Sequence, residues 1–390
     1  MTTAPSTAGT TTTSRRVRRL RTALATSAVL AATAAGTLTA AGPAPAAPAP
    51  AAPAAADRTA DRTTDRTAAT TGSAARRAVV DVEAEEPLDY VAIGDSYSAG
   101  PLIPLLRLDP LGCIRSTSNY PAYLAGHLGA ASYLDVTCSG AETADLVDRR
   151  QETIIPGPAP APQVDVLTDE TDLVTVGIGG NDYGLFGSMI EVCGAVAELD
   201  PDGAPCKRHF TNAKGVDTKV RDADRIRGDV GGVLRAVARR APNAAVVVVG
   251  YPRLLPQRGS CNAVGFAKGD YAWGNKVERR LNRSLRLAAA ANGATYVDLY
   301  PASRGHDACA GSQAWINGKT LNPLRAANFH PFGRGMRAIA QEVYRQLTAG
   351  RTAPARVAPL RADNAVTRPV TPQRRAEVVS AWRRWLADQG

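Results

Sequence analysis

Residues 172–178 read DLVTVGI, and residues 244–249 read AAVVVV, which ends in four consecutive valines. Both runs are apolar without alternation and rich in β-branched residues, a pattern that is typical of strands buried on both faces of a sheet. Weaker runs of the same kind occur at 89–93, 132–136 and 294–299. The sequence therefore predicts five strands at the centre of the fold.

Helical periodicity separates these runs. The amphipathic segments fall at 118–129, 182–194, 218–241, 269–292 and 332–348. Strands that alternate with helices indicate an α/β fold with a parallel sheet wrapped by right-handed crossovers. We expect one domain at 87–350, which is long enough to bury a core of its own. Three segments inside it are predicted to be irregular loops: 101–117, 200–216 and 252–268.

The chain begins with the features of an export signal. Five arginines between positions 15 and 21 precede the uncharged stretch 22–42, and small residues follow at 44–47. This order predicts a cleaved signal peptide at 1–47 and a secreted protein. A transmembrane anchor is the alternative, but the stretch is short and rich in Ala and Thr. Residues 48–86 are rich in Ala, Pro and Thr and are predicted to be a disordered linker.

The charge of the chain lies mainly at its ends. The net charge is +10; residues 1–86 carry ten Arg and seven acidic residues, and residues 351–390 carry eight Arg and three, which leaves +2 for 87–350. A nucleic-acid-binding domain would concentrate its basic residues on the folded unit. The composition therefore gives no support for a nucleic-acid partner.

All six cysteines lie inside the predicted domain. An even number in an exported protein indicates three disulfides, with free buried thiols or a metal site as the alternative. The chain has no C-x-x-C or H-E-x-x-H motif and its four His are scattered, so we expect no metal and no cofactor. The cysteines are Cys113, Cys138, Cys193, Cys206, Cys261 and Cys309.

Residues suited to catalysis follow three of the predicted strands. Ser96 comes after the first, Gly140 after the second and Asn181 after the third, and the carboxyl ends of parallel strands meet at one edge of a sheet. A serine nucleophile needs a base, and His330, just before the last helix, is the candidate. The Ser96 and Gly140 amides and the Asn181 side chain would hold a developing oxyanion. This set predicts acyl transfer.

These residues resemble the name residues of the SGNH hydrolases, also called the GDSL esterase/lipase family. The resemblance covers about 88–348, with the four blocks in order, and extends to a subset of secreted lipases and esterases with three disulfides. It implies a flavodoxin-like three-layer sandwich and hydrolysis of lipid or acyl esters without a cofactor. It also implies sequential cysteine pairs: Cys113–Cys138, Cys193–Cys206 and Cys261–Cys309.

The chain departs from the family pattern at one position. Many members carry Asp three residues before the catalytic His, where this chain has Ala327. The resemblance implies a Ser96–His330 dyad in which the main-chain carbonyl of Ala327 or Asn328 orients the imidazole. Asp95, beside the nucleophile, is predicted to hold the turn. His306 is a weaker candidate for the base.

Other functions fit parts of the sequence. A carbohydrate O-acetyl esterase would use the same residues, and a non-catalytic secreted binding protein would use the same fold. The run Gly177–Asp182 resembles the start of a dinucleotide-binding loop, but Asp182 stands where its last Gly belongs. The G-x-S-x-G elbow of α/β-hydrolases is absent from the chain.

The basic tail, 351–390, contains one amphipathic pattern. Apolar residues recur at helical spacing and predict a helix. Arginines flank the stripe, so segment 375–388 is a candidate for peripheral contact with a lipid surface. The alternative is a helix docked on its own domain, and we expect the protein to be a monomer. The stripe consists of Val378, Val379, Trp382, Trp385 and Leu386.

Overall fold

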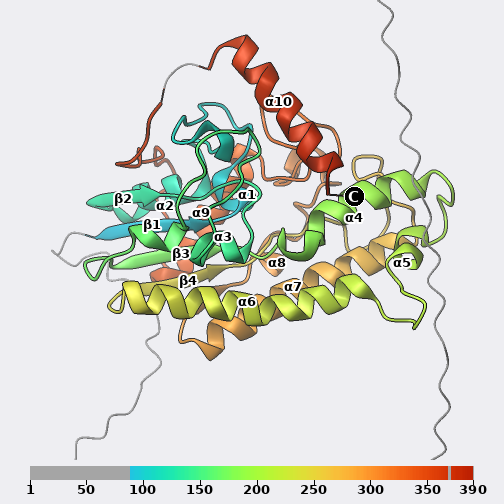
Figure 1. The fold of residues 1–390 in the computed structure, drawn as a ribbon, viewed down its shortest axis with the longest axis horizontal. Coiled ribbons are helices and arrows are strands. Elements are labelled where there is room, and N and C mark those ends of the chain that lie inside the picture. Colours follow the sequence, from blue (N-terminus) through green and yellow to red (C-terminus); the bar gives the residue numbers. More distant parts are fainter. Residues whose placement is uncertain (1–87, 368–369, 390) are drawn as a thin grey trace, which may run out of the picture. The chain divides into compact units, whose positions relative to one another are not determined.

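The computed structural model describes residues 88–367 and 370–389; the predicted signal peptide and linker lie outside this range. Five strands form one parallel sheet in the order β2-β1-β3-β4-β5, which is the flavodoxin-like order (Figure 1). The predicted α/β fold is therefore confirmed. The strands are β1 (Asp89–Gly94), β2 (Ser132–Asp135), β3 (Leu173–Gly177), β4 (Ala245–Val249) and β5 (Thr295–Val297).

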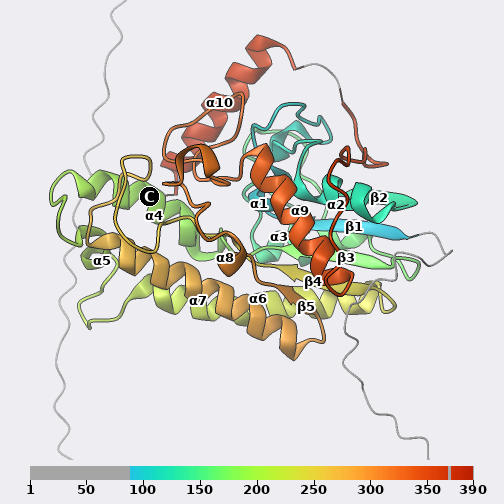
Figure 2. The ribbon, with the colours of Figure 1, turned by 180° about the vertical axis from the view of Figure 1, so that it is seen from behind.

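Both faces of the sheet are covered, which explains the unalternating valines. Side chains of a strand alternate between the two faces. Val248 packs in the core on the side of α6 (Thr218–Arg240) and α7 (Asp270–Ala291). Val247 packs on the opposite side, with α2 (Tyr120–Leu128) and α9 (Gly333–Leu347). These two helices lie next to each other in both opposed views (Figures 1 and 2).

Two predicted segments differ in detail from the structure. The helix expected at 182–194 begins as a 3₁₀ turn, η3 (Asp182–Gly184), and continues as α4 (Leu185–Ala197), because Tyr183 has φ of 58° and interrupts the helix. Segment 200–216, expected to be a loop, contains α5 (Pro205–His209). Asp270 accepts hydrogen bonds from the Cys206 and Lys207 amides of α5. Such a distant partner is invisible to a local pattern.

The remaining elements are short, apart from one helix in the tail. Among the described residues, no helix is long and apolar enough to cross a membrane. The elements are α1 (Ser96–Ala99), η1 (Leu111–Cys113), α3 (Thr143–Val147), η2 (Gln163–Val166), α8 (Leu299–Ala302), η4 (Gly311–Gln313) and α10 (Pro372–Ala387).

The six cysteines form three disulfides in the sequential order that the resemblance implies, and none is free. In each bridge at least one cysteine lies in a segment that connects the strands and the long helices. The bridges thus fix long connections that contribute few residues to the sheet or its covering helices.

Candidate active site

Ser96 lies at the carboxyl end of β1, where the chain turns sharply into α1. Gly94 makes this turn possible, because a Cβ there would lie 2.4 Å from the carbonyl oxygen of Gly177 on the neighbouring strand. The Asp95 carboxylate caps α1 by accepting the Tyr97 amide at 2.8 Å. The Ser96 amide, in the first turn of α1, has no acceptor within the described residues.

His330 lies near the end of the domain in sequence, 234 residues after Ser96, and contacts it in the structure. Its Nε2 lies 2.8 Å from Ser96 Oγ, and its Nδ1 lies 2.7 Å from the main-chain oxygen of Asn328. The carbonyl can only accept, so Nδ1 carries the proton and Nε2 is free to accept from the serine hydroxyl. The Ala327 carbonyl instead accepts from Asn317 Nδ2 at 3.0 Å. Of the two carbonyls considered, Asn328 is the one that contacts the ring.

The segment before His330 is held in an unusual conformation. Phe329 has φ of 57°, in the left-handed region that residues with side chains avoid. The Tyr97 hydroxyl donates to the Phe329 carbonyl at 2.6 Å, and the Phe329 amide donates to Gly318 at 3.0 Å. These contacts hold the turn that aims the imidazole at Ser96.

Burial sets the protonation of the site. Removal from water lowers the pKa of His330 to about 4, only partly opposed by its hydrogen bond to Asn328. The imidazole is therefore neutral at pH 7, which is the form that a general base requires. Burial raises the pKa of Asp95 to about 7, against hydrogen bonds from Tyr251 and Tyr97.

Two candidate donors for an oxyanion lie in the segments that follow β2 and β3. Gly140 has φ of 82°, and its amide has no acceptor within the part of the chain that is described. Asn181 Nδ2 donates to the Ala141 carbonyl at 2.8 Å, which uses one of its two protons and leaves the other. Asp182 accepts from the amide and hydroxyl of Thr143, so the loops that carry Gly140 and Asn181 are tied together.

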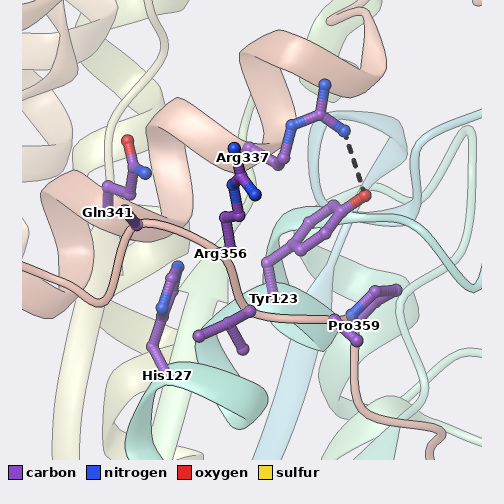
Figure 3. Close-up of a pocket in the computed structure, with 9 residues that line it drawn as sticks. Tyr123, His127, Arg337, Gln341, Arg356 and Pro359 are labelled. Atoms are coloured by element: carbon purple, nitrogen blue, oxygen red, sulfur yellow. Dashed lines mark hydrogen bonds between the residues drawn. The ribbon is translucent and has the colours of Figure 1, made fainter.

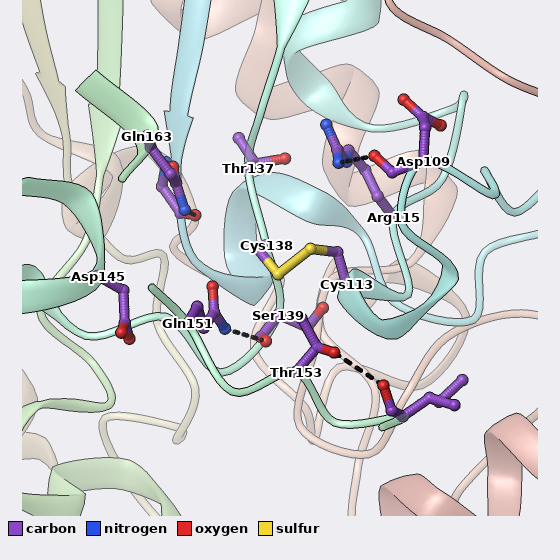
Figure 4. Close-up of a disulfide and its surroundings, with 12 residues drawn as sticks. Asp109, Cys113, Arg115, Thr137, Cys138, Ser139, Asp145, Gln151, Thr153 and Gln163 are labelled. Atoms are coloured by element: carbon purple, nitrogen blue, oxygen red, sulfur yellow. Dashed lines mark hydrogen bonds between the residues drawn. A yellow bond between two sulfur atoms is a disulfide. The ribbon is translucent and has the colours of Figure 1, made fainter. Parts of the chain in front are cut away.

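Cys138, two residues before Gly140 in the chain, forms a disulfide with Cys113 (Figure 4). On either side of this bridge, the Cys138 amide donates to Gly94 at 2.9 Å, and the Ser139 amide donates to Cys113 at 3.0 Å. Gln151 Nε2 holds the Ser139 carbonyl at 2.9 Å. The bridge and its hydrogen bonds therefore fix the loop that presents the Gly140 amide.

No carboxylate of the described residues contacts the His330 ring. Asp307 accepts from the Cys309 amide, and Asp298 caps α8 by accepting from Tyr300. His306, the weaker candidate for the base, stacks on Trp315 with ring centroids 4.7 Å apart. Its Nδ1 lies 2.8 Å from the Gln313 carbonyl oxygen, and His306 does not line the cavity at Ser96.

A larger pocket of about 420 Å³ lies between α2, α9 and residues 355–359 (Figure 3). It shares no lining residue with the cavity at Ser96, and no Ser, Thr or Cys lines it. Arg337 donates to the Tyr123 hydroxyl at 3.2 Å across one side of it. Burial lowers the pKa of His127, which also lines it, so this ring is neutral at pH 7. The pocket lacks the groups for acyl transfer.

Sequence reasoning missed Tyr251, which follows β4 at the same edge of the sheet. Its hydroxyl donates to Asp95 and accepts the Gly180 amide at 2.7 Å, so it links the ends of β1 and β3. The signal was available, because Gly250 and Tyr251 come directly after the valine run. Trp385 and Leu386 line the cavity at Ser96, which agrees with the alternative of a tail helix docked on its own domain; the sequence did not indicate that it docks at the candidate site.

Known proteins share this architecture. Residues 92–338 match the GDSL-like Lipase/Acylhydrolase family. Lipase 2 of Streptomyces coelicolor is 40% identical over 275 residues, which cover 66% of this chain and 85% of that protein. The crystal structures of phospholipase A1 from Streptomyces albidoflavus (TM-score 0.56) and of an extracellular lipase from Streptomyces rimosus (TM-score 0.54) are each 28% identical and cover 68% of this chain and 100% of their own. The chain belongs to the GDSL-like lipase/acylhydrolase family, and it is a carboxylic ester hydrolase.

Proposed function

We propose that the protein is a secreted, monomeric lipase/esterase in which Ser96 is the nucleophile and His330 the general base. The observation that carries the proposal is the chain of two hydrogen bonds from Ser96 Oγ through the imidazole to the Asn328 carbonyl, at 2.8 and 2.7 Å. Three disulfides favour an oxidising compartment and therefore secretion. The extracellular lipase from Streptomyces rimosus supports the same location.

The reaction follows from this arrangement. His330 Nε2 takes the proton of Ser96 Oγ as the oxygen attacks the ester carbonyl. The Ser96 and Gly140 amides and Asn181 Nδ2 donate to the oxyanion that forms. Collapse of this intermediate expels the alcohol, which takes the proton from His330. Water, deprotonated by His330, then attacks the acyl-serine, and the carboxylic acid leaves as Ser96 recovers its proton.

A substrate panel tests the proposal. The full-length protein is assayed on p-nitrophenyl esters from acetate to palmitate and on acetylated xylan, beside Ser96→Ala and the matched control Ser312→Ala, which changes an exposed serine. We expect hydrolysis of medium or long acyl esters, abolished only in Ser96→Ala. A fluorophosphonate probe should label the peptide that contains Ser96.

Two results would overturn it. A strong preference for acetylated xylan would identify a carbohydrate O-acetyl esterase on the same fold. A folded protein that hydrolyses no ester and takes no fluorophosphonate would be a binding protein.

A further inference from the structure

The helix α10 lies over the reaction centre, although it begins well beyond residue 338, where the family match ends. Trp382 is fully buried, and its ring meets the His330 ring edge-on with centroids 5.1 Å apart. Trp382 Nε1 donates to Asn328 Oδ1 at 2.8 Å, on the residue whose carbonyl orients His330. The tail helix is therefore packed against the proposed catalytic base.

The end of α10 occupies the space beside the nucleophile. Trp385 and Leu386 line the cavity that contains Ser96, Asn181 and His330. A Cβ on Gly140 would lie 3.3 Å from the Trp385 ring, so this indole also covers the loop that offers the Gly140 amide. In both views the last turn of α10 lies beside α4 (Figures 1 and 2).

The site is closed to an ester in this arrangement. Ser96 is 4% exposed and His330 is 7% exposed. The cavity between them and α10 has a volume of about 20 Å³, which is room for little more than one water molecule. An acyl chain cannot reach Ser96 Oγ unless some part of the wall moves away.

The helix α10 is the part of the wall that is held least firmly. Only three of its sixteen residues are buried: Val378, Ala381 and Trp382. Within the described residues, its side chains make two hydrogen bonds to the rest of the domain, from Trp382 to Asn328 and from Arg375 to the Pro323 carbonyl. The other walls are the segments that follow strands β1, β3 and β4, residues Phe329 and His330, and α4, which carries the disulfide cysteine Cys193.

The chemistry of α10 matches a lipid surface. Its apolar side carries two tryptophans and a leucine, while Arg383 and Arg384 are exposed on the rest of the helix and Arg374 is exposed in its first turn. A helix with aromatic and leucine residues on one face and arginines on the other binds in the interface of anionic lipids. The face that would enter the lipid is the face that now covers Ser96.

We propose that α10 is a lid over the acyl site and that an anionic lipid–water interface lifts it. On such a surface Trp385 and Leu386 exchange the cavity at Ser96 for the lipid, and the acyl chain enters the space that they leave. This inference rests on the proposed function of Ser96 and His330.

The first test separates the lid from the chemistry with a soluble substrate. We compare the rates at which three proteins hydrolyse p-nitrophenyl butyrate. They are the wild type, the variant Trp385→Ala/Leu386→Ala, which leaves Trp382 in place, and the control Leu199→Ala/Val216→Ala, which changes exposed positions. We expect the first variant to be about tenfold faster or more, because a minor open state is populated at about 10% or less. Equal rates in all three proteins would overturn the proposal.

The second test adds an interface that is not a substrate. Vesicles of diether phosphatidylglycerol contain no ester bond between chain and glycerol. They should raise the wild-type rate on p-nitrophenyl butyrate towards that of Trp385→Ala/Leu386→Ala and should leave that variant nearly unchanged. Neutral diether phosphatidylcholine vesicles should act more weakly. A wild-type rate that ignores both kinds of vesicle would contradict a lid lifted by lipid.

The third test locks the helix. A Cβ on Gly187 would lie 2.9 Å from Gln389 Cβ, near enough for a disulfide in Gly187→Cys/Gln389→Cys after a small shift of the chain end. The oxidised variant should stay slow with vesicles, and mild reduction should restore the response; each single Cys variant and the wild type under the same reductant are the controls. Full activation of the oxidised variant would show that α10 need not move.

The tests also distinguish the two proposals. If no protein hydrolyses any nitrophenyl ester, the proposed function fails. If the wild type hydrolyses these esters, but vesicles do not change its rate and both Trp385→Ala/Leu386→Ala and oxidised Gly187→Cys/Gln389→Cys react at the wild-type rate, only the lid proposal fails.

Discussion

The imidazole of His330 is oriented by a neutral main-chain oxygen, where a carboxylate is the more familiar partner. A carbonyl fixes the tautomer and the direction of the ring as well as a carboxylate does, but it gives less electrostatic support to the imidazolium that forms. The low pKa of about 4 expresses the same fact, since no nearby negative charge offsets burial of the ring. The proposed dyad therefore depends on the geometry of the hydrogen bond from His330 to the Asn328 carbonyl and not on a nearby negative charge.

Neutralising the nearby acids tests this dyad. Asp307→Asn and Asp298→Asn should each retain most of the wild-type kcat, because their carboxylates bond to the Cys309 and Tyr300 amides and not to the ring. In a triad, loss of the carboxylate lowers kcat roughly 10⁴-fold. His330→Ala should abolish turnover as completely as Ser96→Ala, since the two residues act as a unit. An Asp307→Asn enzyme as inactive as His330→Ala, with an unchanged melting temperature, would reveal a displaced triad.

Asn181 offers a second test at a single side chain. Asn181→Ala removes the free Nδ2 proton as well as the hydrogen bond to Ala141. Loss of one oxyanion donor lowers kcat by about 10²–10³, with little change in KM. Thermal melting should show a small loss at most, and Asn243→Ala, at an exposed position, is the control. A kcat within a factor of about two of the wild type would remove Asn181 from the oxyanion hole.

At the scale of elements, two of the three disulfides differ in the segments that they hold. Cys113–Cys138 closes 25 residues and borders the Gly140 loop, whereas Cys261–Cys309 closes 48 residues and borders none of the proposed oxyanion donors. A bridge stabilises a protein mainly by restricting the unfolded chain, and more so for a longer loop. Stability and activity should therefore respond differently to the loss of each bridge.

Removing either Cys113–Cys138 or Cys261–Cys309 by paired Cys→Ala changes should separate the two effects. Both variants should lose about 2–4 kcal/mol of unfolding free energy, with the larger loss for Cys261/Cys309. Only the Cys113/Cys138 variant should also lose kcat at a temperature where it is fully folded, because the Gly140 amide is then less firmly placed. Urea titration and steady-state kinetics measure the two quantities. A normal kcat in the Cys113/Cys138 variant would show that the position of the Gly140 amide does not depend on the bridge.

At the scale of the whole molecule, the sequence predicted what local chemistry determines. Buried strands need runs such as 244–249 and covering helices need periodicity, so the five strands and five main helices lie within a few residues of their predicted positions. The position of Ser96 at a strand end follows from the same pattern. The docking of α10 and the formation of α5 depend on Asn328 and Asp270, which are distant in sequence, and no local pattern contains them.

Buried carboxyl groups give the whole molecule a distinctive response to pH. Burial raises the pKa of Glu278 to about 8, of Asp95 to about 7 and of Asp182 to about 6. Between the ordinary pKa of each group and its raised value, the unfolded chain has released the proton while the native state keeps it, so stability falls as pH rises and levels off above the raised value. His330 acts in the opposite direction, but only below its ordinary pKa of 6.5. Stability should therefore decrease from pH 6.5 to about 8, mainly through Glu278.

Glu278→Gln isolates the largest of these contributions. Glu278 lies on α7 and accepts the Leu254 amide at 3.0 Å, while its other oxygen is buried without a partner in the described residues. In the wild type the carboxyl group costs stability as pH rises from 4.5 to about 8, whereas the amide never ionises. The contributions of Asp95, Asp182 and His330 to the pH dependence are the same in both proteins, so they cancel in the difference. The melting temperature of the variant relative to the wild type should therefore increase between pH 5 and pH 9, as calorimetry can measure, and a difference that stays constant over this range would mean that Glu278 titrates at its ordinary pKa.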